Sequence, residues 1–182
     1  AFVSQSKGMD YMHPFTFNGV RSLIGAASIL VYILISRKIA GDKAAPLDWK
    51  LNVKAGLLCG IFLTIASTLQ QFGIKYTSVG KAGFITTLYI IFVPMFGIFL
   101  KKKVAPVVWA AAVMAAVGMY LLCMTESLRL GAGDIMVFLC AIAFAIQIMT
   151  VDHYAARIDG AVVSCIQFTV CGVVCCIGAL IW

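Results

Sequence analysis

The sequence predicts an all-α membrane protein, a polytopic bundle of helices that crosses a lipid bilayer several times. Of its 182 residues, 63% are hydrophobic and 12% are charged, and the mean hydropathy is +1.04. A soluble domain has about 25% charged and 45–50% apolar residues. A soluble fold of this length could not bury so many apolar side chains. The composition therefore excludes a soluble enzyme domain, a disordered tail and a secreted disulfide scaffold.

Six stretches without a charged residue give the positions of the predicted helices. A helix needs about 20 apolar residues to cross the hydrocarbon core, and most of the stretches approach this length. Backbone groups in lipid must be hydrogen-bonded within the segment, and no alternation typical of barrel strands occurs. The first stretch reaches the required length only if it extends back through Arg21 to Phe15. The six stretches are 22–36, 55–74, 82–100, 104–125, 135–151 and 160–182.

Both ends of the sequence are predicted to lie within helices of a longer protein. The chain starts at Ala1 without a Met, and residues 1–12 are typical of the last turns of a helix. No polar flank follows Trp182. The basic start and cleavage site of a signal peptide are also absent.

The charges in the loops predict the orientation of the helices. Alternate loops place nine Lys and Arg residues on one side of the membrane and four on the other, with Arg21 inside a helix. The side richer in positive charge is normally cytoplasmic. We therefore expect a plasma-membrane protein with its loops at 37–54 and 101–103 in the cytoplasm. The nine are Arg37, Lys38, Lys43, Lys50, Lys54, Lys101, Lys102, Lys103 and Arg157, and the four are Lys7, Lys75, Lys81 and Arg129.

Neither the charge nor the cysteines predict a different function. The net charge of +7 follows from the topology, and no basic, aromatic-rich soluble segment indicates nucleic-acid binding. Cys171 and Cys175 share a helical face, but no CxxC motif or paired His accompanies them. We expect the thiols to pack as small apolar groups, and we expect neither a metal nor a cofactor. The seven cysteines are Cys59, Cys123, Cys140, Cys165, Cys171, Cys175 and Cys176.

A weak internal repeat predicts two inverted halves. Gln5 matches Gln147, and Asp10 matches Asp152 at the same offset of 142 residues. This offset spans five predicted helices, an odd number, so the second copy would cross the membrane in the opposite direction. Inverted repeats are typical of secondary transporters, which bind substrate near the midplane where the repeats meet.

Three segments carry motifs of a known family. Residues 73–97 read GIKYTSVGKAGFITTLYIIFVPMFG, residues 13–21 read HPFTFNGVR with a PF…R pattern, and Gly133-Asp134 precedes an apolar helix. In these segments the chain resembles the EamA-type permeases of the drug/metabolite transporter superfamily. The first resembles the region of helices 3 and 4, the second the entry to helix 2, and the third the start of the second repeat.

The resemblance implies a ten-helix fold made of two inverted five-helix repeats. Residues 1–128 would form the first repeat, from the end of helix 1 to helix 5. Residues 131–182 would begin the second repeat with helices 6 and 7, the latter truncated. The run Lys101-Lys102-Lys103 departs from the family, because many members have an acidic residue beside a basic one there. Charge pairing at this loop therefore stays open.

Arg21 is the strongest candidate for a substrate-binding residue. An ionised Arg within a membrane span costs at least about 2.5 kcal/mol. Its guanidinium is expected to face a cavity that holds a polar or anionic substrate. Alternatively, it reaches the membrane interface or pairs with Asp10. Asn18 lies three residues earlier on nearly the same helical face and is predicted to share the site.

Polar residues elsewhere in the predicted helices are the other candidates for substrate binding. Gln70 and Gln71 lie deep in their helix, and buried amides need hydrogen-bond partners. They either line a wet path or join neighbouring helices. The same alternatives apply to the other amides, and the hydroxyl-bearing residues either face the cavity or pack. These further candidates are Gln5, Gln147, Gln167, Thr86 and Tyr89.

Other residues predict helix geometry. Pro94 removes a backbone hydrogen bond and is expected to kink its helix, either as a gating joint or as a feature of shape. Asp134 is predicted to cap a helix. Small residues four apart let helices approach closely, and they form the pairs Gly56/Gly60 and Ala111/Ala115.

These observations favour a secondary transporter, a permease or exporter that moves a small metabolite or drug-like molecule by alternating access. An intramembrane enzyme would need a catalytic constellation, and the sequence contains none. A channel or structural subunit is a further alternative, but the charge rings or filter of a channel are lacking. The expected partners are the lipid bilayer and a small-molecule substrate, and both a monomer and a homodimer stay open. The substrate and the direction of transport also stay open.

Overall fold

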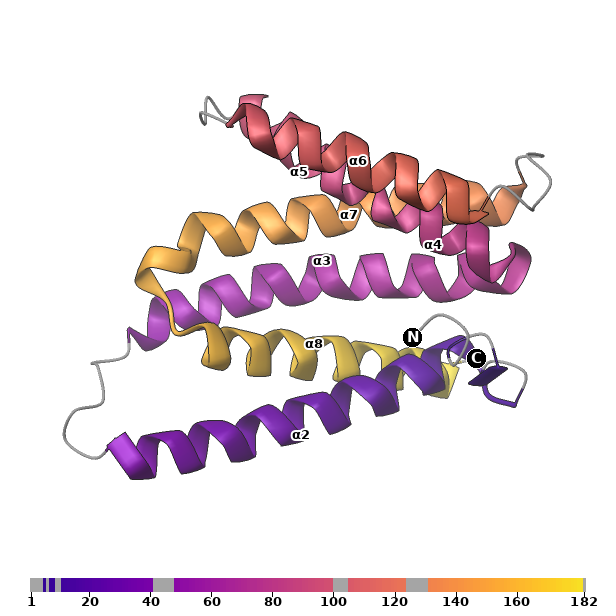
Figure 1. The fold of residues 1–182 in the computed structure, drawn as a ribbon. Coiled ribbons are helices and arrows are strands. Elements are labelled where there is room, and N and C mark those ends of the chain that lie inside the picture. The colour runs from indigo at the N-terminus through magenta and orange to yellow at the C-terminus, as the bar shows by residue number, and fades with distance from the viewer. Residues whose placement is uncertain are drawn as a thin grey trace. The chain divides into compact units, whose positions relative to one another are not determined.

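The described part of the chain is built of helices (Figure 1). A computed structural model describes residues 5, 7–8, 11–40, 48–99, 105–123 and 131–181, and no strand occurs among them. The predicted all-α class is confirmed. Asp10 and the run Lys101-Lys102-Lys103 lie outside the described residues. The elements are α2 (Pro14–Ala40), α3 (Trp49–Tyr76), α4 (Val79–Thr87), α5 (Tyr89–Phe99), α6 (Pro106–Cys123), α7 (Ala132–Tyr154), the 3₁₀ turn η2 (Ala155–Arg157) and α8 (Gly160–Ile181).

Each of the six predicted stretches contains a helix. Five helical segments are long and apolar enough to cross a membrane, and the stretch at 104–125 contains the shorter apolar segment Pro106–Gly118. The first helix extends back past Arg21 to Pro14, which gives it the length needed to cross the membrane. The multi-pass character predicted from composition is therefore confirmed. The five longer segments are Pro14–Ile39, Trp49–Tyr76, Val79–Phe99, Ala132–Arg157 and Gly160–Ile181.

Polar side chains determine where several helices begin. Asp48 precedes α3, and its Oδ1 accepts a hydrogen bond from the N–H of Leu51 at 3.2 Å. Ser78 precedes α4, and its Oγ accepts from the N–H of Lys81 at 3.3 Å. Asp159 caps α8 in the same way. These side chains satisfy N–H groups that have no partner within the first turn of a helix.

The chain divides into two compact units that interleave along the sequence. Unit 1 consists of Ala1–Pro14 and Ile65–Met149, and unit 2 of Phe15–Thr64 and Thr150–Trp182. The long helices α3 and α7 therefore each contribute to both units, whereas α4, α5 and α6 belong to unit 1 and α8 belongs to unit 2.

The core of unit 1 lies mainly between α3, α4 and α7. Ile74, near the end of α3, packs with Val137, near the start of α7. Ala66, earlier in α3, packs with Cys140 and Ala143, later in α7. The two helices are therefore antiparallel. One buried cluster contains Ile74, Ala82, Ile85 and Val137, and the other contains Ala66, Cys140 and Ala143.

Two glycines bring α3 and α7 into backbone contact within unit 1. A Cβ on Gly133 would lie 2.8 Å from the carbonyl oxygen of Gly73, and a Cβ on Gly73 would lie 2.5 Å from Val137 Cγ2. Neither position has room for a side chain. The absence of a Cβ therefore sets how closely the end of α3 approaches the start of α7.

Unit 2 is built on an antiparallel pair, α2 and α8, which lie side by side in Figure 1. Contacts run from Asn18–Cys175 near the start of α2 to Arg37–Asp159 near its end. The sequence numbers rise along one helix as they fall along the other, which establishes the antiparallel direction.

The first part of α3 packs on α8 through glycines in unit 2. A Cβ on Gly56 would lie 2.7 Å from Ile166, and a Cβ on Gly60 would lie 2.8 Å from Cβ of Val170. The residue numbers of these contacts rise together along α3 and α8, so the two segments run parallel. The close approach fits the structural role expected for the Gly56/Gly60 pair.

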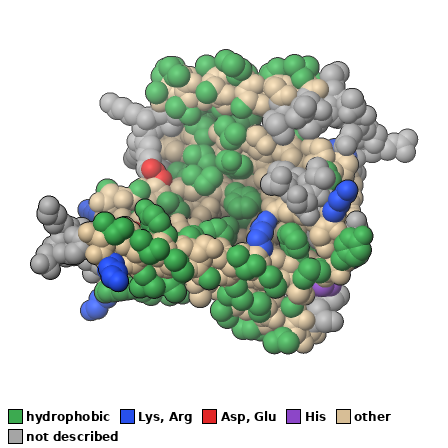
Figure 2. Space-filling view, turned by 60° about the horizontal axis from the view of Figure 1, so that its bottom comes forward, with side chains coloured by type: hydrophobic (Ala, Val, Ile, Leu, Met, Phe, Trp, Pro, Cys, Tyr) green, Lys and Arg blue, Asp and Glu red, His purple; other side chains and the backbone are tan. Residues whose placement is uncertain are grey.

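Large hydrophobic side chains are exposed along the helices. Tyr32 and Leu34 of α2 are more than 60% exposed, and so are Val107 and Met114 of α6. Figure 2 shows hydrophobic side chains spread over the visible face, with scattered charged side chains and His among them. Apolar exposure on this scale marks an interaction surface, and lipid is the partner that fits helices of this length.

The helix of the 82–100 stretch is interrupted at Leu88. α4 ends at Thr87 and α5 begins at Tyr89, while Pro94 lies buried inside α5. The hydroxyl of Thr87 donates to the carbonyl of Gly83 at 2.7 Å, a bond type that often bends helices. The break in the helix therefore lies six residues before the proline from which the sequence predicted a kink.

Candidate functional site

Unit 1 buries two adjacent glutamines of α3. Gln70 Nε2 donates to Thr86 Oγ1 of α4 over a long 3.4 Å, and both side chains are buried. Gln71 is 1% exposed, and neither Oε1 nor Nε2 of its amide has a hydrogen-bond partner among the described residues. A buried amide without a partner loses the hydrogen bonds it makes in water. The amide of Gln71 is therefore available to bind a polar molecule.

The other candidates in unit 1 are placed differently. Gln5 is buried, and its Oε1 has no partner in the part of the chain that the structure describes. Gln147 is half-buried in α7. The ring of Tyr89 packs against Phe144 of α7, with centroids 6.4 Å apart. Of the predicted residues in this unit, the structure thus brings Gln70 and Thr86 into contact.

Unit 2 holds Arg21 and Asn18 together. Arg21 Nη2 donates to Asn18 Oδ1 at 3.1 Å, and the guanidinium carbon lies 6.0 Å from the centre of the Phe17 ring. Arg21 is exposed, whereas Asn18 is 1% exposed. No described carboxylate forms an ion pair with Arg21, and Asp10 lies outside the described residues. The arrangement presents a positive charge beside a buried amide. Gln167 is buried on α8.

The buried end of Asn18 meets two cysteines of α8. Its Nδ2 lies 3.3 Å from Cys175 Sγ and 3.9 Å from Cys171 Sγ, and Ser22 Oγ donates to Cys171 Sγ at 3.5 Å. Sequence reasoning noticed that the two cysteines share a face. It missed their partners, because about 150 residues separate the two helices along the chain.

Lys81 and Asp134 form a buried ion pair that sequence reasoning also missed. Lys81 Nζ lies 2.8 Å from Asp134 Oδ2, and the Asp134 side chain is 2% exposed. Asp134 Oδ2 also accepts from the N–H of Gly131 at 2.9 Å, and Oδ1 accepts from the hydroxyl of Thr77. Asp134 is the third residue of α7, and its carboxylate bonds back to the N–H of Gly131 just before the helix; it also joins α7 to α4.

A smaller polar group lies where α3 and α8 begin in unit 2. Asn52 Oδ1 accepts from the N–H of Asp159 at 2.9 Å, and Asn52 Nδ2 donates to the carbonyl of Asp48 at 2.8 Å. Arg37 lies 3.7 Å from the Asp159 carboxylate, with both side chains about 40% exposed. Such an exposed pair adds little stability, so this group mainly aligns the two helix starts.

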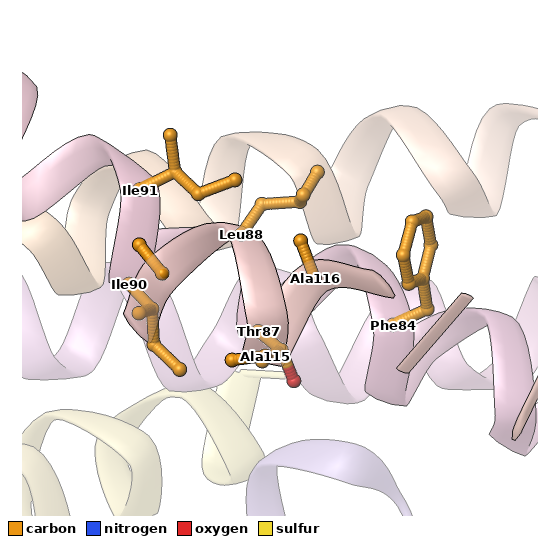
Figure 3. Close-up of a pocket in the computed structure, with 8 residues that line it drawn as sticks. Phe84, Thr87, Leu88, Ile90, Ile91, Ala115 and Ala116 are labelled. Atoms are coloured by element: carbon orange, nitrogen blue, oxygen red, sulfur yellow. The ribbon is translucent and has the colours of Figure 1, made fainter. Parts of the chain in front are cut away.

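The crevice between α4, α5 and α6 is not suited to a polar substrate. Its lining is apolar apart from Thr87, whose hydroxyl bonds to its own helix (Figure 3). The crevice is too narrow for a water molecule. Of the predicted packing pair on α6, Ala115 lines this crevice while Ala111 is exposed. The crevice therefore lies beside the break at Leu88 and offers no polar group to a substrate.

Comparison with known proteins gives the family. Residues 1–124 match the EamA-like transporter family. A protein of Archaeoglobus fulgidus named as an uncharacterized transporter is 30% identical over 153 residues, which cover 81% of this chain. The chain spans 42% of the length of that relative. No solved structure matches the chain. The family match covers more than half of the sequence, and the chain belongs to the EamA-like transporter family.

Proposed function

We propose that this chain is part of a secondary transporter that moves a small polar metabolite or drug-like molecule across the plasma membrane by alternating access. The observation that carries the proposal is the amide of Gln71, buried in a membrane-crossing helix without a partner among the described residues. Polar groups are kept inside membrane helices where a substrate or ion path needs them.

The whole transporter is proposed to contain ten helices in two inverted repeats. Residues 1–128 would be the first repeat and 131–182 the start of the second. Three observations support this division: the family match at 1–124, the chain's 42% share of its relative, and the antiparallel course of α2 and α8. In inverted repeats, α8 would be the counterpart of α2 and would cross the membrane in the opposite direction.

Two separate substrate contacts are proposed, one within each unit. Gln71, with Gln70 and Thr86 beside it, would supply neutral hydrogen bonds from unit 1. Arg21 with Asn18 would supply a positive charge from unit 2. Gln5, Tyr89, Gln147 and Gln167 are proposed as further contacts. This chemistry favours a substrate with a carboxylate or another anionic group.

Flux through proteoliposomes of the full-length protein tests the proposal. We expect saturable uptake of at least one compound from a panel of amino acids, nucleosides, sugars and cationic drugs, and none in empty vesicles. Arg21→Ala should abolish this uptake while the protein still inserts into the membrane, and Arg37→Ala is the matched control. Unsaturable conductance would point to a channel instead, and wild-type uptake by Arg21→Ala would remove Arg21 from the site.

A further inference from the structure

The thiols of Cys171 and Cys175 lie together where α8 crosses α2. Residues four apart on a helix have Cβ atoms about 5–6 Å apart on one face. The Nδ2 atom of Asn18 touches both sulfurs, at 3.9 Å and 3.3 Å. Both thiols are buried, at 1% and 0% exposure. The crossing thus contains a dithiol enclosed by protein.

The groups around the two sulfurs are hydrogen-bond donors. Asn18 Nδ2 and Ser22 Oγ both direct hydrogens at sulfur. Asn18 Oδ1 accepts from Arg21 Nη2, so Arg21 holds the amide with its NH₂ group toward the cysteines. Donors in these positions stabilise negative charge on metal-bound sulfur.

Arg21 supplies a positive charge beside the two cysteines. Its guanidinium donates to Asn18, whose amide contacts both sulfurs, and no carboxylate of the described helices pairs with it. A monovalent cation held by two thiolates carries a net charge of −1, which the guanidinium cancels. Neutrality matters here, because a lone charge in the membrane interior is costly.

The number and chemistry of the two sulfur ligands indicate which metal ion could bind there. No group of three or more His, Cys, Asp or Glu that could hold a metal exists among the described residues, so the four-ligand site that Zn²⁺ takes is not formed by them. Soft sulfur ligands select Cu(I) and similar ions over hard cations, which take oxygen. Two sulfurs suit a soft monovalent cation with two-coordinate geometry.

We propose that Cys171 and Cys175 form a binding site for a soft monovalent cation of the Cu⁺/Ag⁺ class. Asn18, Ser22 and Arg21 are its positioning residues. On binding, each S–H bond breaks, two sulfur–metal bonds form and two protons pass to the solvent, with no electron transferred. This site shares Asn18 and Arg21 with the substrate contacts proposed above, but its test by Ag⁺ binding does not depend on transport.

Close packing brings the two helices together beside these cysteines. A Cβ on Gly172 would lie 2.7 Å from Leu23 Cδ2, and a Cβ on Gly19 would lie 2.9 Å from Cys176 Sγ. A glycine from each helix therefore sits at the crossing. Cys176 lies against Gly19 and provides a neighbouring control.

Titration of the purified full-length protein with Ag⁺ tests the site, because Ag⁺ binds thiolates without oxidising them. We expect one Ag⁺ to bind tightly at this site with release of two protons. C171S and C175S should each eliminate this binding event. Asn18→Ala and Arg21→Gln should weaken it about 10- to 100-fold, as loss of supporting groups does. Cys140→Ser, which alters a buried thiol of unit 1, and Cys176→Ser should leave it unchanged.

X-ray absorption of the Ag⁺-loaded wild-type protein provides a second measurement that does not depend on the folding of any variant. Two sulfur ligands are expected, and nitrogen or oxygen ligands would overturn the proposal. It is equally overturned if folded C171S and C175S bind Ag⁺ as tightly as the wild type, or if Cys176→Ser alone eliminates binding.

Discussion

At the scale of single residues, the molecule keeps polar groups in two kinds of surroundings. Asn18 makes hydrogen bonds through both ends of its amide, to Arg21 and to the α8 thiols. Gln71 is as deeply buried but has no partner among the described residues. The first arrangement stabilises the protein, whereas the second costs stability. The substrate contact that we propose for Gln71 would offset this cost, so function and stability would be opposed at this residue.

Replacement of Gln71 by Leu should separate these effects. Leu removes the unpaired amide, so we expect an increase in stability of about 1–3 kcal/mol, the usual cost of an unsatisfied buried group. Uptake by the full-length protein should fall. Melting in detergent and flux in proteoliposomes measure the two effects. Gln70→Leu is the control, because it breaks the bond to Thr86 and should not raise the melting temperature. A melting temperature that falls equally in both variants would contradict this interpretation of Gln71.

At the scale of helices, buried charges and glycines fix how pairs of elements meet. Lys81 of α4 and Asp134 of α7 form the strongest polar link in unit 1. A buried ion pair is tolerated when both partners are present, and removal of one leaves an uncompensated charge. Glycines fix the distance between helices in another way, because they permit backbone contact that any side chain would prevent.

Lys81→Met alone should destabilise the protein by about 3–5 kcal/mol, because it leaves Asp134 charged and unpaired. The double variant Lys81→Met/Asp134→Leu should recover part of this loss, since neither charge then remains buried. Chemical denaturation of the three proteins in detergent measures the coupling. Additive losses in the double variant would show that the pair does not act as a unit.

Gly60→Ala should destabilise the contact of α3 with α8, because the new Cβ would lie 2.8 Å from Val170 and 3.2 Å from the backbone of Gln167. Gly118→Ala on α6 is the matched control. A Cβ there meets nothing within 4 Å, so the better helix propensity of Ala, worth up to about 1 kcal/mol, should dominate. Melting temperatures should move in opposite directions, and a shared direction would exclude close packing at Gly60 as the cause.

At the scale of the whole molecule, the sequence predicts the number and position of helices well. Each apolar stretch is a local property, and lipid leaves no alternative to a helix. The contacts between helices were not predictable in this way. Asp134 was expected to cap its own helix, but Lys81 lies 53 residues earlier, and no local pattern links the two. Likewise, the sequence predicts a kink from Pro94, while the helix assignment breaks at Leu88, beside Thr87, whose hydroxyl bonds to the carbonyl of Gly83.

Orientation across the membrane is the untested prediction at this scale. The loop at 101–103 contains three consecutive lysines and should be cytoplasmic. Trypsin should therefore cleave there in inside-out vesicles and leave the loop intact in right-side-out vesicles or intact spheroplasts. A Lys101→Gln/Lys102→Gln/Lys103→Gln variant controls for cleavage elsewhere. Cleavage only from the outer side would reverse the proposed topology.

The contact between Asn18 and Cys175 has a consequence for how the protein is made. The two residues are 157 positions apart, so α2 enters the membrane long before α8 leaves the ribosome. At synthesis rates of about 5–20 residues per second, this interval lasts on the order of ten to thirty seconds. During that time the amide and the charge of Arg21 lack their final neighbours. A nascent chain stalled before α8 should therefore stay bound to the insertion machinery, which shelters its polar face until α8 arrives.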